Sequence, residues 1–221
     1  MRGKLIVFEG LDRAGKTTQC GRLIVHLQEH GHRVVHMRFP DRTTPIGQMI
    51  NAYLTGASEQ EDHVIHLLFS ANRWEAAAKI KNLVAEGTTV VIDRYYYSGC
   101  VYSAAKDNPS LSLEWARHPE VGLPRPDLVV FLDISPEKAA QRGGFGSEKY
   151  ENSKMQKRVR ELFTDIKTLQ QEGQDFVTID AGAAEEEVAK RVEEAVLRAV
   201  ETVDETNSPL RLVESIRGNV D

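Results

Sequence analysis

Residues 10–17 carry the clearest chemical signal in this sequence. They read GLDRAGKT, which matches the pattern G-x-x-x-x-G-K-[ST], and they lie between an apolar run and a helical pattern. In such a loop the backbone amides point at phosphate oxygens, Lys16 can neutralise the β- and γ-phosphates, and Thr17 can offer its hydroxyl to Mg²⁺. A glycine turn before a helix is also an ordinary structural element. The strand before it and the helix after it favour a phosphate-binding loop.

Charged side chains also lie at or just after the ends of two further apolar runs. Asp93 and Arg94 follow the run Thr89–Ile92, and Arg42 comes shortly after the second run. Because parallel strands place their carboxyl ends at one crevice, these side chains would face the phosphate loop. Asp93 could hold Mg²⁺ through water, and Arg94 could bind a phosphate with two parallel hydrogen bonds. The structural alternatives are a salt bridge at the strand end for Asp93 and Arg94, and simple solvation for Arg42.

Five short apolar runs recur along the chain, with amphipathic stretches between them. Three of the runs are continuous, which is typical of strands buried on both faces of a parallel sheet. Helical patterns cover Thr17–His30, His63–Glu86 and Glu185–Val203. We therefore expect an α/β fold with three layers, α/β/α, around a five-stranded parallel sheet. The expected strands are Leu5–Glu9, Val34–Phe39, Thr89–Asp93, Leu128–Asp133 and Phe176–Asp180.

A single domain over residues 1–203 accounts for this alternation. The tail, residues 204–221, has weak periodicity, and we expect it to be loosely ordered. Trp74 is interpreted as a core aromatic. His63 and His66 are spaced as neighbours on one helix face, but no third ligand accompanies them, so we interpret them as surface histidines rather than a metal site.

The composition argues against several classes of partner. Lys and Arg number 28 against 33 Asp and Glu, and the net charge of −5 argues against general nucleic-acid or anionic-membrane binding. No apolar run approaches the roughly 18 residues of a membrane span, and a strand begins too early to leave room for a signal peptide. Cys20 and Cys100 have neither metal nor disulfide spacing. We expect a reducing compartment, the cytoplasm or the nucleus.

A phosphate loop alone leaves the reaction open. The chain has no Asn-Lys-x-Asp motif of the kind with which GTPases read their base. The fourth apolar run ends in one acid, Asp133, rather than in the acidic pair of AAA-type ATPases. Nucleoside and nucleotide kinases remain.

Four further motifs accompany the loop, in order and with unbroken spacing. They are RFP at 38–40, LLFSANRWE at 67–75, DRY at 93–95 and YEN at 150–152. Together with the loop they resemble the thymidylate kinase family of the eukaryotic type, a P-loop nucleoside-monophosphate kinase family. The resemblance runs from about Leu5 to Val200, and the run LFSANR is far more specific than the loop.

The resemblance implies that ATP·Mg²⁺ phosphorylates dTMP to dTDP, a step in dTTP synthesis for DNA replication. Phe69 would stack on thymine, and Arg73, one helical turn later, would reach the O4 atom of the base. Asp12 would accept the 3′-hydroxyl, and Tyr102 would fill the space that a ribose 2′-hydroxyl needs. On periodicity alone, Phe69 would be a core aromatic and Tyr102 a packing residue.

The glycine-rich segment 142–152 has the composition of a lid that excludes water during phosphoryl transfer. A plain surface loop is the alternative. The resemblance assigns Arg142 to stacking on adenine, and Tyr150 with Glu151 to the dTMP side. It also assigns the transition-state arginine to the phosphate loop, here Arg13. The chain departs from the eukaryotic type in one respect, because it also has a lysine in the lid, Lys149, which we expect to assist Arg13.

The expected site residues form four sets. The catalytic residues are Arg13, Lys16, Asp93 and Arg94. The ATP-binding residues are Gly10, Asp12, Arg13, Ala14, Gly15, Lys16, Thr17, Thr18, Arg142, Asp180 and Gly182. The dTMP-binding residues are Asp12, Phe39, Arg42, Phe69, Arg73, Arg94, Ser98, Gly99, Tyr102, Tyr150 and Glu151. The Mg²⁺ ligands, partly through water, are Thr17 and Asp93.

The resemblance also implies a homodimer, which we expect to form through the helix at His63–Glu86 and its neighbours. Two other functions stay open at this point. One is a kinase for another nucleoside or nucleoside monophosphate. The other is a nucleotide-sensing binding protein whose site has lost activity.

Overall fold

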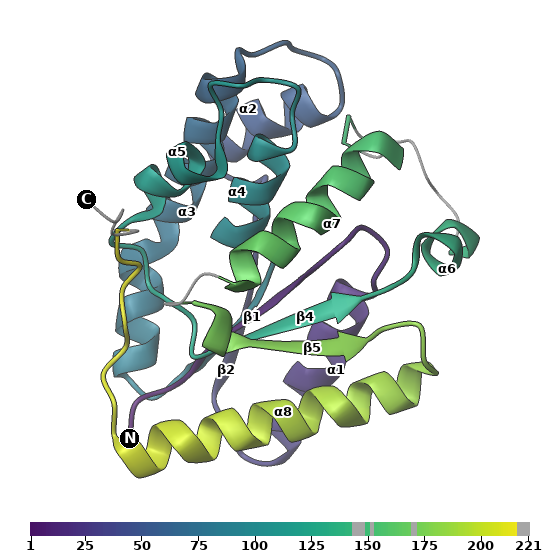
Figure 1. Ribbon diagram of the computed structural model, residues 1–221. Coiled ribbons are helices and arrows are strands. Elements are labelled where there is room, and N and C mark those ends of the chain that lie inside the picture. The colour runs from purple at the N-terminus through teal and green to yellow at the C-terminus, as the bar shows by residue number, and fades with distance from the viewer. Residues whose placement is uncertain (143–148, 151–152, 169–171, 216–221) are drawn as a thin grey trace, which may run out of the picture.

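A computed structural model describes residues 1–142, 149–150, 153–168 and 172–215 (Figure 1). Five strands form one parallel sheet in the order β2-β3-β1-β4-β5. The expected fold class is confirmed. Each expected strand begins at the observed first residue, and its last residue differs from the observed one by at most one position. The strands are β1 (Leu5–Gly10), β2 (Val34–Arg38), β3 (Thr89–Asp93), β4 (Leu128–Asp133) and β5 (Phe176–Asp180).

The central strand β1 explains why its sequence is apolar without alternation. It pairs with β3 and β4, and all of its residues are buried. Leu5 and Val7 belong to the core on one face of the sheet, whereas Ile6 and Phe8 belong to the core on the other. Both faces therefore need a helical cover, as a parallel sheet requires.

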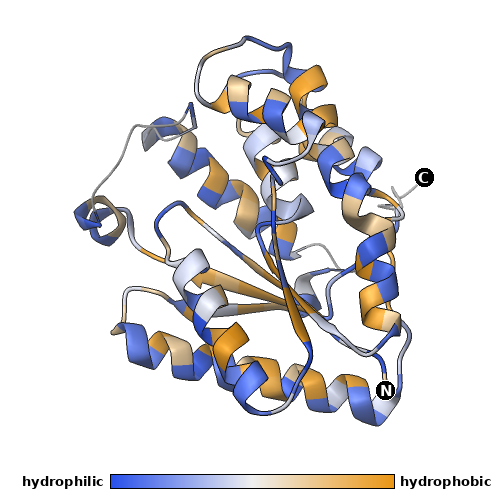
Figure 2. Cartoon of the chain, turned by 180° about the vertical axis from the view of Figure 1, so that it is seen from behind, coloured by the Kyte–Doolittle hydropathy of each residue, from blue (hydrophilic) through white to orange (hydrophobic). Residues whose placement is uncertain are grey.

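Helices cover both faces of the sheet. α1 (Lys16–Glu29) and α8 (Glu185–Thr206) pack on one face, and α3 (Asp62–Ala85), α4 (Tyr96–Ala104) and α7 (Ser153–Thr168) pack on the other. Figure 2 shows apolar strands at the centre and polar residues along the outer sides of the helices. None of the described helices combines the length and the apolar character that crossing a bilayer would require. The shorter elements are α2 (Pro45–Leu54), α5 (Leu113–Arg117), α6 (Pro136–Gln141) and the 3₁₀ turns His118–Glu120 and Gly173–Asp175.

Two interpretations on α3 are corrected by the structure. His66 is fully buried, with Nδ1 2.7 Å from the Ser103 hydroxyl and Nε2 2.8 Å from the carbonyl of Ala116. Trp74 is exposed, and its indole donates to the carbonyl of Pro119 at 2.8 Å. The helix contacts α2 on one side and α4 on another, so a single apolar stripe could not separate its buried positions from its exposed ones.

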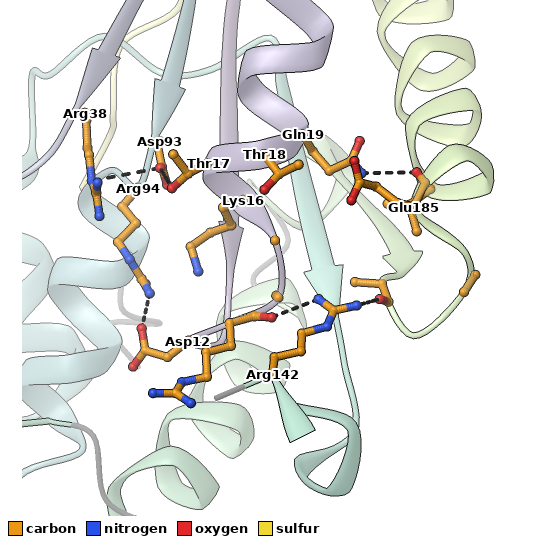
Figure 3. Close-up of a pocket in the computed structure, with 16 residues that line it drawn as sticks. Asp12, Lys16, Thr17, Thr18, Gln19, Arg38, Asp93, Arg94, Arg142 and Glu185 are labelled. Atoms are coloured by element: carbon orange, nitrogen blue, oxygen red, sulfur yellow. Dashed lines mark hydrogen bonds and ion pairs between the residues drawn. The ribbon is translucent and has the colours of Figure 1, made fainter. Parts of the chain in front are cut away.

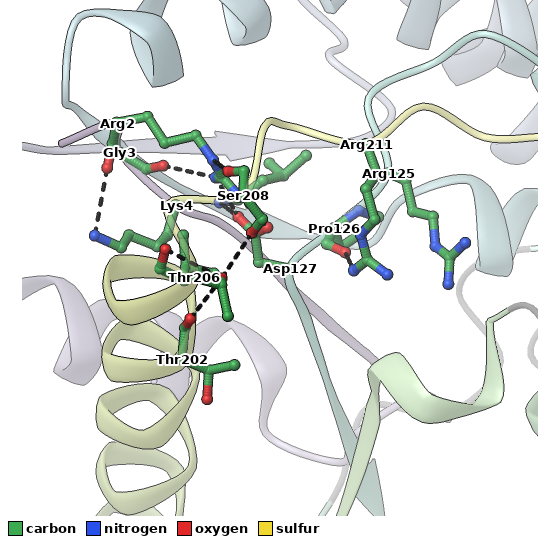
Figure 4. Close-up of polar contacts among 12 residues, drawn as sticks. Arg2, Gly3, Lys4, Arg125, Pro126, Asp127, Thr202, Thr206, Ser208 and Arg211 are labelled. Atoms are coloured by element: carbon green, nitrogen blue, oxygen red, sulfur yellow. Dashed lines mark hydrogen bonds and ion pairs between the residues drawn. The ribbon is translucent and has the colours of Figure 1, made fainter.

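The described part of the tail is docked rather than loosely ordered. α8 continues past residue 203 to Thr206, and the chain then runs beside the N-terminus, where Arg2 Nε donates to the carbonyl of Ser208 at 2.7 Å (Figure 4). Val213 is buried, and its amide donates to the carbonyl of Leu123 at 2.8 Å. Three of the tail's contacts are hydrogen bonds between backbone atoms, which leave no periodic signal in the sequence.

Candidate active site

The phosphate loop joins β1 to α1 at the carboxyl edge of the sheet. Gly15 has a φ of +88°, a backbone conformation that glycine adopts without strain, and α1 begins at the next residue. Lys16 Nζ donates to the carbonyls of Gly10 at 3.1 Å and Leu11 at 2.7 Å. A cavity of about 500 Å³ opens in front of the loop, and we call it the donor cavity (Figure 3). It is lined by residues 12–19, Arg38, Asp93, Arg94, Arg142, Ala181, Ala183, Glu185 and Val188.

The buried ammonium group of Lys16 gives the donor cavity its electrostatic character. Burial removes water from the charge and Arg94 repels it, and together they lower the pKa of Lys16 to about 7. Asp12 and Asp93 act in the opposite direction but do not compensate fully. A bound polyphosphate would place further negative charge beside Lys16 and so stabilise its charged form. The cavity is therefore suited to an anion.

Thr17 and Asp93 face each other across the loop. Thr17 Oγ1 donates to Asp93 Oδ2 at 2.6 Å, and Arg38 Nε lies 3.9 Å from the same oxygen (Figure 3). A hydroxyl and a carboxylate are the hard oxygen ligands that Mg²⁺ accepts, provided that phosphates and water complete its shell. Over the part of the chain that the structure describes, no three His, Cys, Asp or Glu side chains gather as a metal cluster.

Arg142 connects the phosphate loop with the turn after β5. Its Nη1 donates to the carbonyl of Arg13 at 2.9 Å and its Nη2 to the carbonyl of Ala181 at 2.7 Å. In the same turn the amide of Gly182 donates to Asp180 Oδ1 at 2.8 Å. Arg142 lines the donor cavity, whereas Asp180, Gly182 and Gly10 lie beside it and do not line it.

A second cavity of about 210 Å³ adjoins the first, and we call it the acceptor cavity. Asp12, Arg38 and Arg94 line both cavities. Every expected dTMP-binding residue that the structure describes lines the acceptor cavity, and Glu151 lies outside the described residues. The full lining is Asp12, Arg38, Phe39, Pro40, Arg42, Leu54, Phe69, Arg73, Arg94, Tyr95, Ser98, Gly99, Tyr102, Ser103 and Tyr150.

Asp12 lies at the centre of a polar cluster between the two cavities. Arg94 donates to its Oδ1, while Tyr102 at 3.1 Å and Gln156 Nε2 at 2.7 Å donate to its Oδ2. Burial alone would raise the pKa of Asp12, but Arg94 and Lys16 outweigh it and hold the pKa below its usual value. Asp12 is therefore an anion that can accept a hydroxyl hydrogen bond.

Phe69 and Arg73 lie one turn apart on α3, and both line the acceptor cavity. Arg73 is buried and forms two hydrogen bonds with Glu120. A buried arginine on α3 is thus explained by an ion pair at the wall of the cavity.

Two other expected cations lie differently from each other. Arg42 lines the acceptor cavity and donates to Asn51 Oδ1 at 2.9 Å. Lys149 lines neither cavity, because its Nζ lies 2.5 Å from Glu59 and 4.2 Å from the ring centre of Tyr53. The assisting role of Lys149 stays a prediction.

Several polar residues of the site were missed by the sequence reasoning. Glu9, fully buried at the end of β1, accepts hydrogen bonds from the amides of Tyr95 and Ser98 and so fixes the start of α4. A charged residue inside an apolar strand was the signal that could have found it. Gln156 and Glu120 carried no comparable signal, because their partners lie far away in the sequence.

A parallel sheet with a phosphate loop after its first strand, and two adjoining cavities at its carboxyl edge, define a phosphotransferase of the P-loop kinase class. The comparisons with known proteins narrow this class. A family model described as thymidylate kinase matches residues 8–192. The chain therefore belongs to the thymidylate kinase family.

Individual relatives agree with this assignment. A thymidylate kinase from Arabidopsis thaliana is 48% identical over 214 residues, which is 97% of this chain and 78% of that protein. One from Danio rerio is 49% identical over 193 residues, 87% of this chain and 89% of that protein. The solved structure of thymidylate kinase from Candida albicans superposes with a TM-score of 0.81 at 34% identity and covers 96% of this chain and 98% of that one.

Proposed function

We propose that this protein transfers the γ-phosphoryl group of ATP to the phosphate of dTMP and releases dTDP and ADP. The observation that carries the proposal is the pair of adjoining cavities, which share Asp12 and Arg94. The phosphate loop opens into one of them, and Phe69 and Arg73 line the other. Membership of the thymidylate kinase family supports dTMP as the acceptor.

The chemistry needs no general base, because the acceptor phosphate is already an anion near neutral pH. Catalysis then consists of positioning and charge neutralisation. Lys16 and Arg13 act on the transferred phosphoryl group, and Arg42 and Arg94 hold the acceptor phosphate.

The family typically needs a divalent cation, and we propose Mg²⁺. Thr17 and Asp93 present a hydroxyl and a carboxylate oxygen at the mouth of the loop, which suits this ion. When bound there, Mg²⁺ neutralises charge on the phosphate oxygens of ATP.

The test is a coupled assay with ATP, Mg²⁺ and a panel of dTMP, dUMP, UMP, dCMP and thymidine. We expect the highest kcat/KM with dTMP. A preference for another nucleotide or for thymidine would favour the alternative of a related kinase. Binding of ATP and dTMP without turnover would favour a nucleotide-sensing protein, although Lys16, Thr17, Asp93 and Arg94 are all in place.

We further propose a homodimer in the cytoplasm or the nucleus. Val64, Leu67 and Trp74 are exposed on α3 at spacings of three and seven, so they form one apolar stripe on the helix. A second copy of the chain that packs along this stripe would remove it from water.

A further inference from the structure

Arg73 and Glu120 form a buried ion pair at the wall of the acceptor cavity. Arg73 Nε donates to Glu120 Oε2 at 2.9 Å, and Nη2 donates to Oε1 at 2.5 Å. Both side chains are buried, but only Arg73 lines the cavity. Since a guanidinium group has five N–H donors in one plane, Glu120 leaves Nη1 and one hydrogen of Nη2 for a ligand.

The backbone around Glu120 is attached to α3 on both sides of Arg73. The carbonyl of Pro119 accepts from Ser70 Oγ at 3.2 Å and from Trp74 Nε1 at 2.8 Å. The carboxylate therefore approaches Arg73 from a segment that α3 itself holds. A rigid partner of this kind selects one orientation of the guanidinium plane.

Gly99 of α4 approaches the same guanidinium closely. A Cβ atom at this position would lie 2.6 Å from Nη2 and 2.8 Å from Nη1 of Arg73. Glycine inside a helix costs about 1 kcal/mol relative to alanine, so its presence here fits a need for this close contact. Arg73 is thus confined by Glu120 and by the bare backbone at Gly99.

The charge of Glu120 has a dedicated partner. Burial disfavours the charged form of Arg73, but Glu120 outweighs this effect and the pKa of Arg73 lies above its usual value. His66 Nε2 lies 3.9 Å from Glu120 Oε1, but burial first and Arg73 second lower the pKa of His66 to about 4, so it is neutral near pH 7. Lys106, whose charge also acts on His66, pairs with Asp62 at 2.9 Å.

We propose that Glu120 is a positioning residue that fixes the Arg73 guanidinium and thereby sets the nucleobase selectivity of the acceptor cavity. The proposal rests on the proposed function. Donors held in place favour a base with a carbonyl oxygen at the facing position, as in thymine O4. They disfavour an amino group there, as in cytosine, because two donors would face each other without an acceptor.

The first test compares Glu120→Gln with a matched control, Glu172→Gln. Glu172 forms a second buried ion pair, with Arg117, and neither residue lines the donor or the acceptor cavity. For Glu120→Gln we expect the ratio of kcat/KM for dTMP over dCMP to fall by about 10- to 100-fold, the value of one hydrogen bond to a charged group. The KM for ATP should stay within about twofold, since Arg73 does not line the donor cavity.

The control separates positioning from general stability. Both variants should unfold more easily because each leaves a buried arginine without its carboxylate. Only Glu120→Gln should change the base ratio. An unchanged ratio in Glu120→Gln, or an equal change in Glu172→Gln, would overturn the proposal. Wild-type protein that does not phosphorylate dTMP at all would instead overturn the proposed function.

A second variant keeps the test open if Glu120→Gln does not fold. Gly99→Ala leaves all charges in place, and its methyl group, 2.6 Å from Nη2 of Arg73, would displace the guanidinium. We expect the same fall in the dTMP to dCMP ratio with an unchanged KM for ATP. A Gly99→Ala variant with wild-type base selectivity would show that the orientation of Arg73 does not set it.

Discussion

Asp12 and Arg94 line both cavities, so the ion pair that they form lies where the two cavities adjoin. Arg94 lies in a left-handed backbone conformation with a φ of +65°, directly after β3, and this turns its guanidinium toward the phosphate loop. A non-glycine residue in this region costs about 1–3 kcal/mol and persists where the surroundings hold it. Glu9, which accepts the amide of the next residue, Tyr95, is part of what holds it.

The catalytic role of Arg13 can be tested with little structural disturbance. Arg13 has a φ of +65°, so Arg13→Gly fits the backbone of the loop. If the guanidinium binds the transferred phosphoryl group mainly in the transition state, kcat should fall by at least about 100-fold, while KM for both substrates changes little. Steady-state kinetics with dTMP and ATP measure this. A near-normal kcat would indicate that Lys149, rather than Arg13, supplies the catalytic charge. Lys149→Ala in the same background should then abolish activity.

The lowered pKa of Lys16 predicts that the protein takes up protons when ATP binds. In the free protein its pKa is about 7, so at pH 8 it is mostly neutral, and phosphate oxygens would return the pKa toward its ordinary value of 10.5. We expect uptake of about one proton per MgATP at pH 8 and a smaller uptake at pH 6. Calorimetric titration in two buffers with different heats of ionisation measures it. Identical binding heats in both buffers at pH 8 would show that Lys16 is already charged in the free protein.

Among single residues, the sequence predicted those that belong to motifs, but not the residues that hydrogen-bond to them and hold them in place. The loop and the two strand ends could be found because each motif is local, and the fold brings strand ends together at one edge. Glu120 lies 47 residues from Arg73, and Gln156 lies 144 residues from Asp12. No pattern within a short window connects such pairs.

Residues of helix α3 lie in three different environments. Phe69 and Arg73 line the acceptor cavity, Asn72 Oδ1 accepts the amide of Asp41 at 2.7 Å, and Trp74 is exposed. The sequence predicted the extent of this helix closely because its helical pattern is long. The periodicity could not assign its faces, since residues on most sides of the helix have a partner.

Because the tail is docked, substitutions at two neighbouring residues should change the free energy of unfolding by different amounts. Val213 is 2% exposed and Leu212 is 44% exposed. Val213→Ala should lower the free energy of unfolding by about 1–2 kcal/mol, from lost apolar burial and the space left behind. Leu212→Ala, the control, should change it by less than about 0.5 kcal/mol. Urea denaturation measures both, and equal values for the two variants would show that the tail does not dock in solution.

The whole molecule has an apolar core on each face of its sheet, and this is why its architecture could be predicted. Continuous apolar strands require two helical layers, and short connections with right-handed crossovers leave few arrangements. A contact between two chains, as proposed above, is harder to predict from a sequence, because residues of an interface resemble residues of a core. Trp74 shows this ambiguity, since its type suggested burial within the chain.

The stripe on α3 allows a test of the proposed homodimer. Leu67 is 47% exposed in the middle of the stripe, and a second copy packed there would bury it. Leu67→Glu should therefore shift the protein from about twice the chain mass of 24.8 kDa to a single chain. Glutamate is a good helix former, so α3 itself should remain folded. Sedimentation over a range of concentrations measures the mass.

Leu197 provides the matched control for this substitution. It is 43% exposed on α8, away from the stripe, so Leu197→Glu adds the same charge to a helix and should leave the dimer intact. If the wild-type protein sediments as a single chain at every concentration, the homodimer is wrong. If Leu197→Glu dissociates the protein as fully as Leu67→Glu, the contact between subunits does not run along α3. Dissociation by Leu67→Glu alone would assign it to this helix.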